Sequence, residues 1–388
     1  MDGIVMSLVT ARTQHLLINV YQHDVDDFYT GYVQAVADDG VVLRTFSDAG
    51  LADGFAFVAL RAIDSIEVAG ADLDNMAYRI ATADELRFRA TPAAPLAMPL
   101  HDDNPLLYQV AENMRRTGQA VLCVTIDAEN YLEGQIVAVH EDNLELSVFN
   151  KFNYTDRRRI QVDYSSLQVL EYEGYDLMLE TALLAQRATL THTPTHRYPN
   201  NNNADKILQA AQQTNQLVAV LARQNFENFY VGRVITVNQQ WAVIRLIDMA
   251  GQFGGYTLLR VSAVHSVIIA SDYLTTMDFY ERWGQAHSFI QVPVLNQERE
   301  FDAASDLLGD LLSEGEIFGR VYRVRGTQDN GVEPIMGTPS AVDQDSFTII
   351  PTGANAEAGQ TFRNSEVQAL SFGNVYTFLQ ERWLSDKE

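Results

Sequence analysis

Four copies of one short pattern constrain the fold of this 388-residue chain more than any other feature. In three copies an aromatic residue stands three positions before a glycine and an apolar run follows, at Phe28–Val36, Tyr131–Val139 and Phe229–Val237. The weaker fourth copy has Pro334 in the aromatic position. The repeated glycines lie 103, 98 and 105 residues apart, at Gly31, Gly134, Gly232 and Gly337. Repetition at a nearly fixed period indicates four copies of one structural unit.

The segments around each glycine also repeat. A β-rich run precedes it, as in LLINV at 16–20, and a polar turn and another apolar strand follow, as in DDG at 38–40 before VVLRTF. Each copy closes on two apolar residues three positions apart, such as Ile63 and Ile66. Alternating apolar residues mark half-buried strands. About five short strands within roughly 55 residues cannot bury a flat sheet, so we expect each copy to curl into a small bent barrel.

The glycines fit this expectation. Glycine weakens a strand unless the backbone must bend there or approach another chain closely. Because one glycine recurs at the same position of the second expected strand, we predict that Gly31, Gly134, Gly232 and Gly337 are structural residues at strand bends.

Helical patterns flank the expected barrels, with apolar residues at helical spacing as in Leu107, Val110, Ala111 and Met114. The predicted helices cover 72–83, 104–117, 175–186, 205–214, 273–283, 303–314 and 375–383. Stretches rich in Pro or Asn at 91–99 and 189–203 are typical of linkers. The predicted fold is mainly β with short helices (α+β), in four tandem five-stranded barrels. The predicted domains are 1–90, 103–188, 204–286 and 302–388.

The glycine strand, its polar turn and the strand after it resemble the first motif of the Sm-like (LSm/Hfq-type) barrels, a kind of SH3-like barrel. The closest stretches are GQIVAVHEDNLELSVF at 134–149 and GYVQAVADDGVVLRTF at 31–46. The resemblance covers about 55 residues in each of the four copies. It implies an N-terminal helix on a five-stranded barrel, ring assembly through strand edges, and often binding of uridine-rich RNA.

Two departures from the family pattern concern RNA binding. The Arg-Gly pair that precedes the last strand in the family is absent from the corresponding stretches at 60–63, 164–167 and 261–264. The base-holding Asn or aromatic position after the turn carries Val41, Leu144 or Trp241. Trp241 alone could stack on a base, and a core position is the more typical role for such a residue.

The charge of the chain also disfavours polyanionic partners. Its formal net charge is −24, from 27 basic and 51 acidic residues, and binding to phosphate backbones depends on Lys and Arg. Residues 201–300 are nearly neutral, with 7 basic and 8 acidic side chains. The candidate contacts to an anionic partner are therefore Arg233, Arg245 and Arg260, together with the one basic run, Arg157, Arg158 and Arg159. The alternative for that run is a solvated loop balanced by neighbouring carboxylates.

The sequence predicts no catalytic, cofactor-binding or metal-binding residue. His192 and His196 have the spacing of a helical metal pair, but Pro194 between them disfavours a helix. The single cysteine, Cys123, lies in an apolar run and is interpreted as a small buried hydrophobe. No stretch is long and apolar enough to predict a membrane span, and no signal peptide is indicated, so we expect a cytoplasmic protein.

These observations lead to a functional expectation rather than an identification. We expect a non-enzymatic interaction or scaffold protein that binds a protein partner, or a second copy of itself, by pairing at strand edges. Binding of RNA or single-stranded nucleic acid is the alternative that the family resemblance implies.

Overall fold

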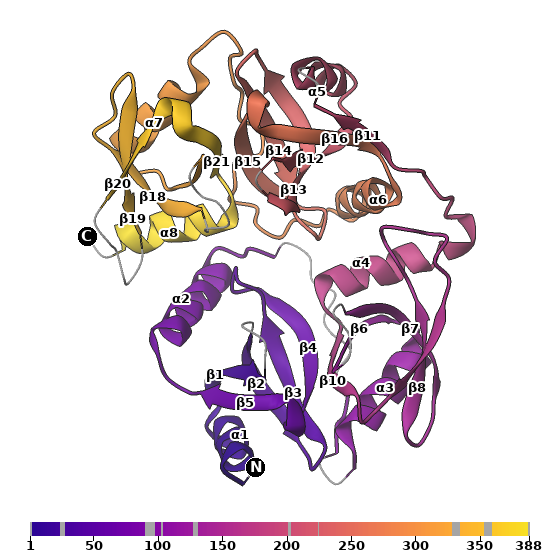
Figure 1. Cartoon of the computed structure of the whole chain (residues 1–388). Helices are drawn as coiled ribbons and strands as arrows, with labels where there is room; N and C mark the ends of the chain where they lie inside the picture. The colour runs from indigo at the N-terminus through magenta and orange to yellow at the C-terminus, as the bar shows by residue number, and fades with distance from the viewer. Residues whose placement is uncertain are drawn as a thin grey trace. The chain divides into compact units, whose positions relative to one another are not determined.

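The computed structural model describes residues 2–23, 28–89, 98–101, 104–126, 131–200, 203–223, 225–327, 334–352 and 359–386 (Figure 1). The chain divides into two compact units, Met1–His192 and Thr193–Glu388. Each unit contains two of the four sequence repeats.

The first unit builds one open, ten-stranded antiparallel sheet from repeats 1 and 2. Repeat 1 consists of α1 (Asp2–Gln14), β1 (Leu17–Gln22), β2 (Phe28–Val36), β3 (Gly40–Phe46), β4 (Ala52–Ala59), the 3₁₀ turn η1 (Leu60–Ala62), β5 (Ile63–Glu67) and α2 (Ala71–Glu85). Repeat 2 consists of α3 (Leu106–Thr117), β6 (Ala120–Thr125), β7 (Leu132–Val139), β8 (Asn143–Val148), β9 (Arg159–Asp163), β10 (Leu167–Tyr172), α4 (Tyr175–Leu184) and η2 (Arg187–Thr189). The strand order is β5-β1-β2-β3-β4-β10-β6-β7-β8-β9.

The second unit builds an open, eleven-stranded antiparallel sheet in the same manner. Repeat 3 consists of β11 (His196–Pro199), α5 (Ala204–Gln213), β12 (Leu217–Ala222), β13 (Asn225–Val237), β14 (Trp241–Ile247), β15 (Phe253–Arg260), η3 (Val261–Ala263), β16 (Val264–Ala270) and α6 (Asp272–Ala286). Repeat 4 consists of α7 (Leu307–Phe318), β17 (Tyr322–Gly326), β18 (Ile335–Ser340), β19 (Ser346–Pro351), β20 (Gln360–Arg363), η4 (Asn364–Glu366), β21 (Val367–Phe372) and α8 (Val375–Ser385). The strand order is β11-β16-β12-β13-β14-β15-β21-β17-β18-β19-β20.

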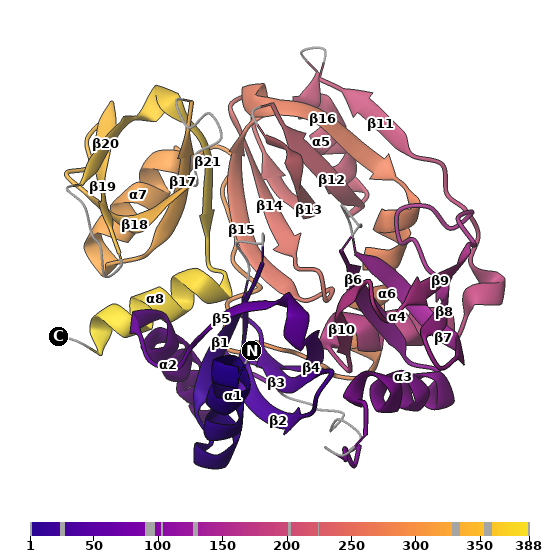
Figure 2. The ribbon, with the colours of Figure 1, turned by 60° about the horizontal axis from the view of Figure 1, so that its bottom comes forward.

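The expected mixed class, mostly β with short helices, is confirmed at this level. Each of the seven predicted helices overlaps an observed one, and the expected face of α3 is buried through Leu107, Val110, Ala111 and Met114. Helix α1 and strand β11 were not predicted. Figure 2 shows α5 against the strands of repeat 3, where it packs on β13 and β16.

The apolar cores extend across the repeats within each unit. In unit 1 a single cluster of buried side chains joins Leu8 of α1 and Phe57 of β4 to Leu106 of α3 and Leu170 of β10. In unit 2 one cluster joins Trp241 and Leu258 of repeat 3 to side chains of repeat 4 such as Phe347. Two repeats therefore share apolar packing as well as a sheet.

The four repeated glycines lie in the second strand of their repeats, against the third strand. A Cβ atom added at Gly31, Gly134, Gly232 or Gly337 would stand 2.1–2.2 Å from a backbone carbonyl oxygen of the neighbouring strand. In the first three repeats the strand register shifts two to four residues after the glycine, as between Val33 and Ala35. Such bulges increase bending and twist. Close backbone approach therefore explains why this position carries glycine.

Two single residues match their sequence interpretations. Cys123 on β6 is fully buried, and this burial raises the pKa of its thiol to about 12. Trp241 is buried in the core at 3% exposure, with the Arg260 guanidinium 4.2 Å from its ring centroid. A buried indole of this kind presents no open face to a nucleic-acid base.

Candidate functional site: the junctions between repeats

The most distinctive feature of each unit is the strand pair that joins its two repeats. In unit 1 the fourth strand of repeat 1, β4, pairs with the fifth strand of repeat 2, β10. Val58 lies opposite Val169, and Phe55 stacks on Tyr172 with ring centroids 5.4 Å apart. The adjacent edges are thus closed by backbone hydrogen bonds and by buried apolar side chains.

Unit 2 repeats this junction between β15 and β21. Tyr256 lies opposite Phe372, with ring centroids 5.7 Å apart, and the hydroxyls of Thr257 and Ser371 are 2.8 Å apart. When the repeats are aligned on their strands, Tyr256 corresponds to Phe55 and Phe372 to Tyr172. The two junctions therefore have the same register.

A glycine with positive φ precedes the stacked aromatic residue in both units. Gly54 has φ +74° and Gly255 has φ +88°, values that favour glycine. A Cβ atom at Gly54 would stand 2.4 Å from the backbone of Gly174, and one at Gly255 would stand 2.7 Å from that of Asn374. The start of the fourth strand therefore lies close against the N-terminal end of the last helix, α4 or α8, and leaves no room for a side chain at this glycine.

An arginine of repeat 1, Arg61, hydrogen-bonds to the backbone of repeat 2 across the unit 1 junction, an interaction called the arginine brace below. The Arg61 guanidinium donates hydrogen bonds to the carbonyl oxygens of Tyr164 and Leu167, at 2.6 and 2.5 Å. Arg61 lies in the stretch 60–63, and its guanidinium reaches the neighbouring repeat.

In unit 2 an arginine at a different position of the repeat makes the equivalent hydrogen bonds across the junction. The Arg260 guanidinium donates to the carbonyl oxygens of Val367 and Asn364, both at 2.6 Å. Val367 and Asn364 are the counterparts of the two acceptors in unit 1, but Arg260 stands two positions earlier in its repeat than Arg61 does. Both junctions therefore use charge-assisted hydrogen bonds to the same carbonyls, although the arginine is not aligned in sequence.

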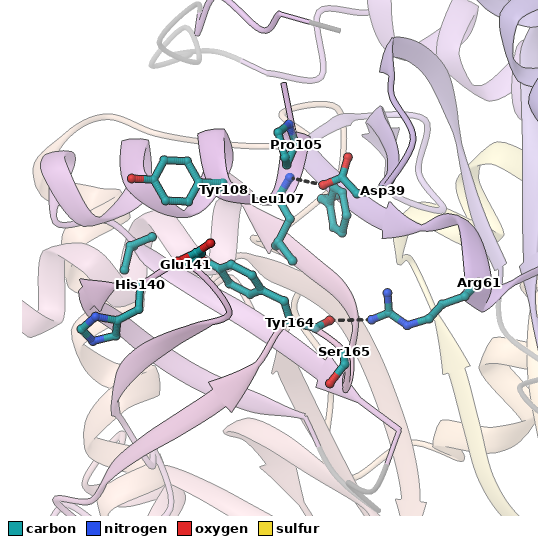
Figure 3. A pocket seen from close by; sticks show the side chains of 11 residues that line it. Asp39, Arg61, Pro105, Leu107, Tyr108, His140, Glu141, Tyr164 and Ser165 are labelled. Carbon is teal, nitrogen blue, oxygen red and sulfur yellow. Dashed lines mark hydrogen bonds between the residues drawn. The ribbon is translucent and has the colours of Figure 1, made fainter. Parts of the chain in front are cut away.

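A pocket of about 680 Å³ opens beside the unit 1 brace (Figure 3). Asp39, from the turn between β2 and β3, accepts hydrogen bonds from the backbone N–H groups of Leu106 and Leu107 at 3.0 and 2.9 Å. This carboxylate holds the N-terminal turn of α3 at one wall of the pocket. Figure 3 shows Tyr108, His140 and Tyr164 around the same space. The cavity has the size and the aromatic lining of a small-ligand or side-chain site.

The carboxyl group of Glu171 forms a hydrogen bond between the two repeats of unit 1. The Tyr29 hydroxyl on β2 donates a hydrogen bond to Glu171 on β10. Burial raises the pKa of Glu171 to about 7, and the Tyr29 hydrogen bond opposes that increase. Burial raises the pKa of Glu173 to about 7 as well, and its carboxyl oxygens have no hydrogen-bond partner in the described part of the chain.

A second buried charge cluster ties α4 to the strands of repeat 2. The Lys151 ammonium lies 2.8 Å from a carboxylate oxygen of Glu133, and both side chains are buried. Glu180 of α4 is buried next to them, and its pKa is raised well above its usual value by burial and by Glu133. The cluster contains one of the three lysines of the chain, and it anchors the helix rather than facing solvent.

The predicted anion-contacting arginines are spread over three places. Arg158 pairs with Asp156 at 2.7 Å and Arg159 with Glu145 at 3.3 Å, so two members of the basic run are balanced by carboxylates. Arg233 and Arg245 both pair with Glu281 on α6, at 2.5 and 3.5 Å. Arg260 braces the junction, and Arg157 is exposed. These six residues are not brought together in one site.

Other observations limit the chemistry of the described residues. Among them, no group of three or more His, Cys, Asp or Glu side chains is arranged to hold a metal ion. His196 lies in β11, an extended strand, so the spacing of His192 and His196 is not helical. None of the described helices is long and apolar enough to cross a membrane.

Comparisons with known proteins do not identify a family. No family model matches the chain, and no curated protein matches it. One similar solved structure is the crystal structure of the four MBT repeats of Drosophila melanogaster Sfmbt in complex with a peptide. It is 10% identical, the alignment covers 91% of this chain and 87% of that chain, and the TM-score is 0.12. At that TM-score the likeness carries no argument about this chain.

Proposed function

We propose that this chain is a non-enzymatic scaffold of four Sm-like barrels, which binds a protein partner or a second copy of itself through open strand edges. The observation that carries the proposal is the pairing of a fourth strand with the next repeat's fifth strand, which occurs in both units. Edge pairing of this kind is what the Sm-like resemblance implies for ring assembly. Each covalent pair of repeats would then correspond to two neighbouring subunits of a ring.

The ends of the sheets support this proposal because the sheet of unit 1 ends in one strand of each kind that pairs at the junctions, a fifth strand and a fourth strand. In the described part of unit 1, the sheet ends at β5, a fifth strand, and at β9, a fourth strand. In unit 2 the fourth strand β20 is terminal, while the fifth strand β16 is covered by β11. An uncovered edge presents unpaired backbone donors and acceptors. We therefore propose that β5 is the edge on which the fourth strand of another repeat, or an equivalent strand of a partner, docks.

A residue on β5 provides a specific test. Ser65 is exposed, and its counterpart on β10 is Val169, which is fully buried in the junction. If a strand docks on β5 as β4 docks on β10, Ser65 becomes buried and Ser65→Lys should block docking, because a lysine at a strand edge opposes pairing. Ser313→Lys on the exposed face of α7 adds the same charge and serves as the control.

Size-exclusion chromatography with light scattering measures the outcome for self-association. The proposal predicts a concentration-dependent oligomer for the wild type and for Ser313→Lys, and a monomer for Ser65→Lys. A wild type that stays monomeric at its highest soluble concentration would exclude self-association. An oligomer that is unchanged by Ser65→Lys would exclude β5 as the docking edge.

A further inference from the structure

One position at the junction carries a carboxyl group in unit 1 and a hydroxyl group in unit 2. In unit 1, Tyr29 of β2 donates its hydroxyl to the Glu171 carboxyl of β10. Tyr230 is the counterpart of Tyr29, because each stands two residues before the strand glycine. Ser371 is the counterpart of Glu171, because Glu171 lies opposite Ala56 and Ser371 opposite Thr257 in matching registers. Unit 2 therefore lacks the carboxyl group that accepts the tyrosine hydrogen bond in unit 1.

A cavity of about 330 Å³ occupies this place in unit 2. Its walls come from β12, β13, β17, β21 and the residue before β18, and Figure 2 shows β21 between β15 and β17. The lining side chains include Arg323 and Arg325 on one face of β17, Tyr230 on β13 and Ser371 on β21. Among the described residues that line the cavity, none carries a carboxylate.

The residues of unit 1 at the positions of the two arginines are not basic. Arg323 lies opposite Ser371, whereas Leu122 lies opposite Glu171 in unit 1. Arg325 lies opposite Ala369, and the equivalent residue of unit 1 is Val124. Where unit 1 has two apolar side chains and an internal carboxyl, unit 2 has two guanidinium groups and a cavity.

Neither guanidinium is neutralised by the described part of the chain, in which Arg323 and Arg325 form no ion pair or hydrogen bond. This is notable in a chain with a net charge of −24. Burial raises the pKa of Tyr230, and Arg325 and Arg323 partly oppose that increase, so the hydroxyl keeps its proton at neutral pH. The cavity is therefore lined by two guanidinium groups, the phenol hydroxyl of Tyr230 and the Ser371 side chain.

We propose that this cavity is a binding site for the phosphate group of a small phosphate monoester, which takes the place that the Glu171 carboxyl occupies in unit 1. Two guanidinium groups match the charge of a phosphate dianion and supply paired N–H donors. The cavity lies at the small end of the range for small-molecule sites. Phe229 lines the cavity and forms an edge-to-face contact with Tyr273, which leaves an apolar wall beside the proposed phosphate position.

The experiment is an isothermal titration of the full-length protein with inorganic phosphate and with AMP, at constant ionic strength maintained with chloride. The variants are Arg323→Gln, Arg325→Gln and Ser371→Glu, and the control is Arg157→Gln, which removes an exposed arginine of unit 1. Thermal unfolding of each variant verifies folding. Ser371→Glu recreates the unit 1 arrangement, so its carboxylate should occupy the site while the strand pairing is kept.

We expect binding by the wild type and by Arg157→Gln, affinity at least about tenfold weaker in each arginine variant, and loss of binding in folded Ser371→Glu. Tighter binding of AMP than of phosphate would identify the monoester as the better ligand, whereas equal binding would restrict the site to the phosphate group. An absence of binding to both probes by the wild type would overturn the proposal. Equal affinities in the wild type and in Ser371→Glu would also overturn it.

Discussion

Glu171 is a half-buried residue whose carboxyl group accepts a hydrogen bond from Tyr29 of the neighbouring repeat. Its pKa rises from 4.5 to about 7, mainly because burial disfavours the charged carboxylate. Between these two values the folded protein binds more protons at this residue than the unfolded chain does. The stabilisation is therefore complete below about pH 4.5 and is lost as the pH rises through about 7.

This linkage gives a prediction at the scale of a single residue. The free energy of unfolding of unit 1 should fall between pH 5 and pH 8, and Glu171→Gln should reduce that fall by up to about 3 kcal/mol. Glutamine cannot ionise, and it can still accept the Tyr29 hydrogen bond. Urea unfolding at several pH values measures the effect.

Glu300→Gln is the matched control, because Glu300 is an exposed glutamate in unit 2. It should leave the pH dependence of unfolding unchanged. The residual fall in Glu171→Gln is assigned to Glu173, whose pKa is also raised to about 7 by burial, and to Glu180, whose pKa is raised by burial and by Glu133. If Glu171→Gln has the same pH profile as the wild type, Glu171 ionises normally in the folded protein and the assignment is wrong.

The repeated glycines stand out in the sequence, whereas the cavity arginines do not. Arg323 and Arg325 lie among residues 301–388, which hold 6 basic and 14 acidic side chains, so a regional charge count conceals them. Arg233 and Arg245 attracted attention because their region is nearly neutral, yet Glu281 on α6 pairs with both. Local composition does not reveal which arginine meets a carboxylate, because the partner comes from a distant element.

At the scale of the element, the second strand of each repeat must bend where it crosses the third. The carbonyl oxygen of Arg245 would lie 2.1 Å from a Cβ at Gly232, far inside van der Waals contact. Because that oxygen belongs to a backbone in the middle of the sheet, it cannot rotate away as a side chain would. A methyl group at this position should therefore push β13 and β14 apart.

The corresponding prediction is that Gly232→Ala lowers the free energy of unfolding of unit 2 by about 1–3 kcal/mol or more, as overpacked cores do. Gly3→Ala is the control, because Gly3 lies in α1 and a Cβ there meets no atom within 4 Å. It should be neutral or slightly stabilising, since alanine favours helix formation over glycine. Equal effects of the two substitutions in denaturant unfolding would show that the strand does not need glycine.

Elements with strong periodicity were predictable, and those without it were not. Helix α3 carries a clear apolar face, so its position follows from Leu107, Val110 and Met114. Helix α1 was missed because Met6 and Val9 are exposed and blur the stripe formed by Leu8 and Ala11. Strand β11 consists of exposed residues that include a proline, so only its pairing with β16 defines it.

At the scale of the whole molecule, the central result is that the repeats are joined in pairs through β4–β10 and β15–β21. The Sm-like resemblance implies pairing at strand edges, but the sequence does not specify which strands pair or in which register, because the joined residues lie more than a hundred positions apart, as with Thr257 and Ser371. The arginine braces were equally hidden, since Arg61 and Arg260 occupy different positions in their repeats. Long-range register depends on tertiary packing that one sequence does not display.

The most direct test of this account is a cross-link at the unit 2 junction. The Thr257 and Ser371 hydroxyl oxygens are 2.8 Å apart, so Thr257→Cys/Ser371→Cys should form a disulfide under mild oxidation without loss of thermal stability. The native Cys123 is fully buried and should not compete. Thr257→Cys/Val367→Cys, displaced by four residues along β21, is the register control and should not form a bridge.

Peptide mapping by mass spectrometry under non-reducing conditions gives the result. We expect one bridged peptide pair, from β15 and β21, in the Thr257→Cys/Ser371→Cys protein and none in the register control. Free thiols at both positions in the folded protein, or equal bridging in the control, would contradict the pairing of repeats 3 and 4.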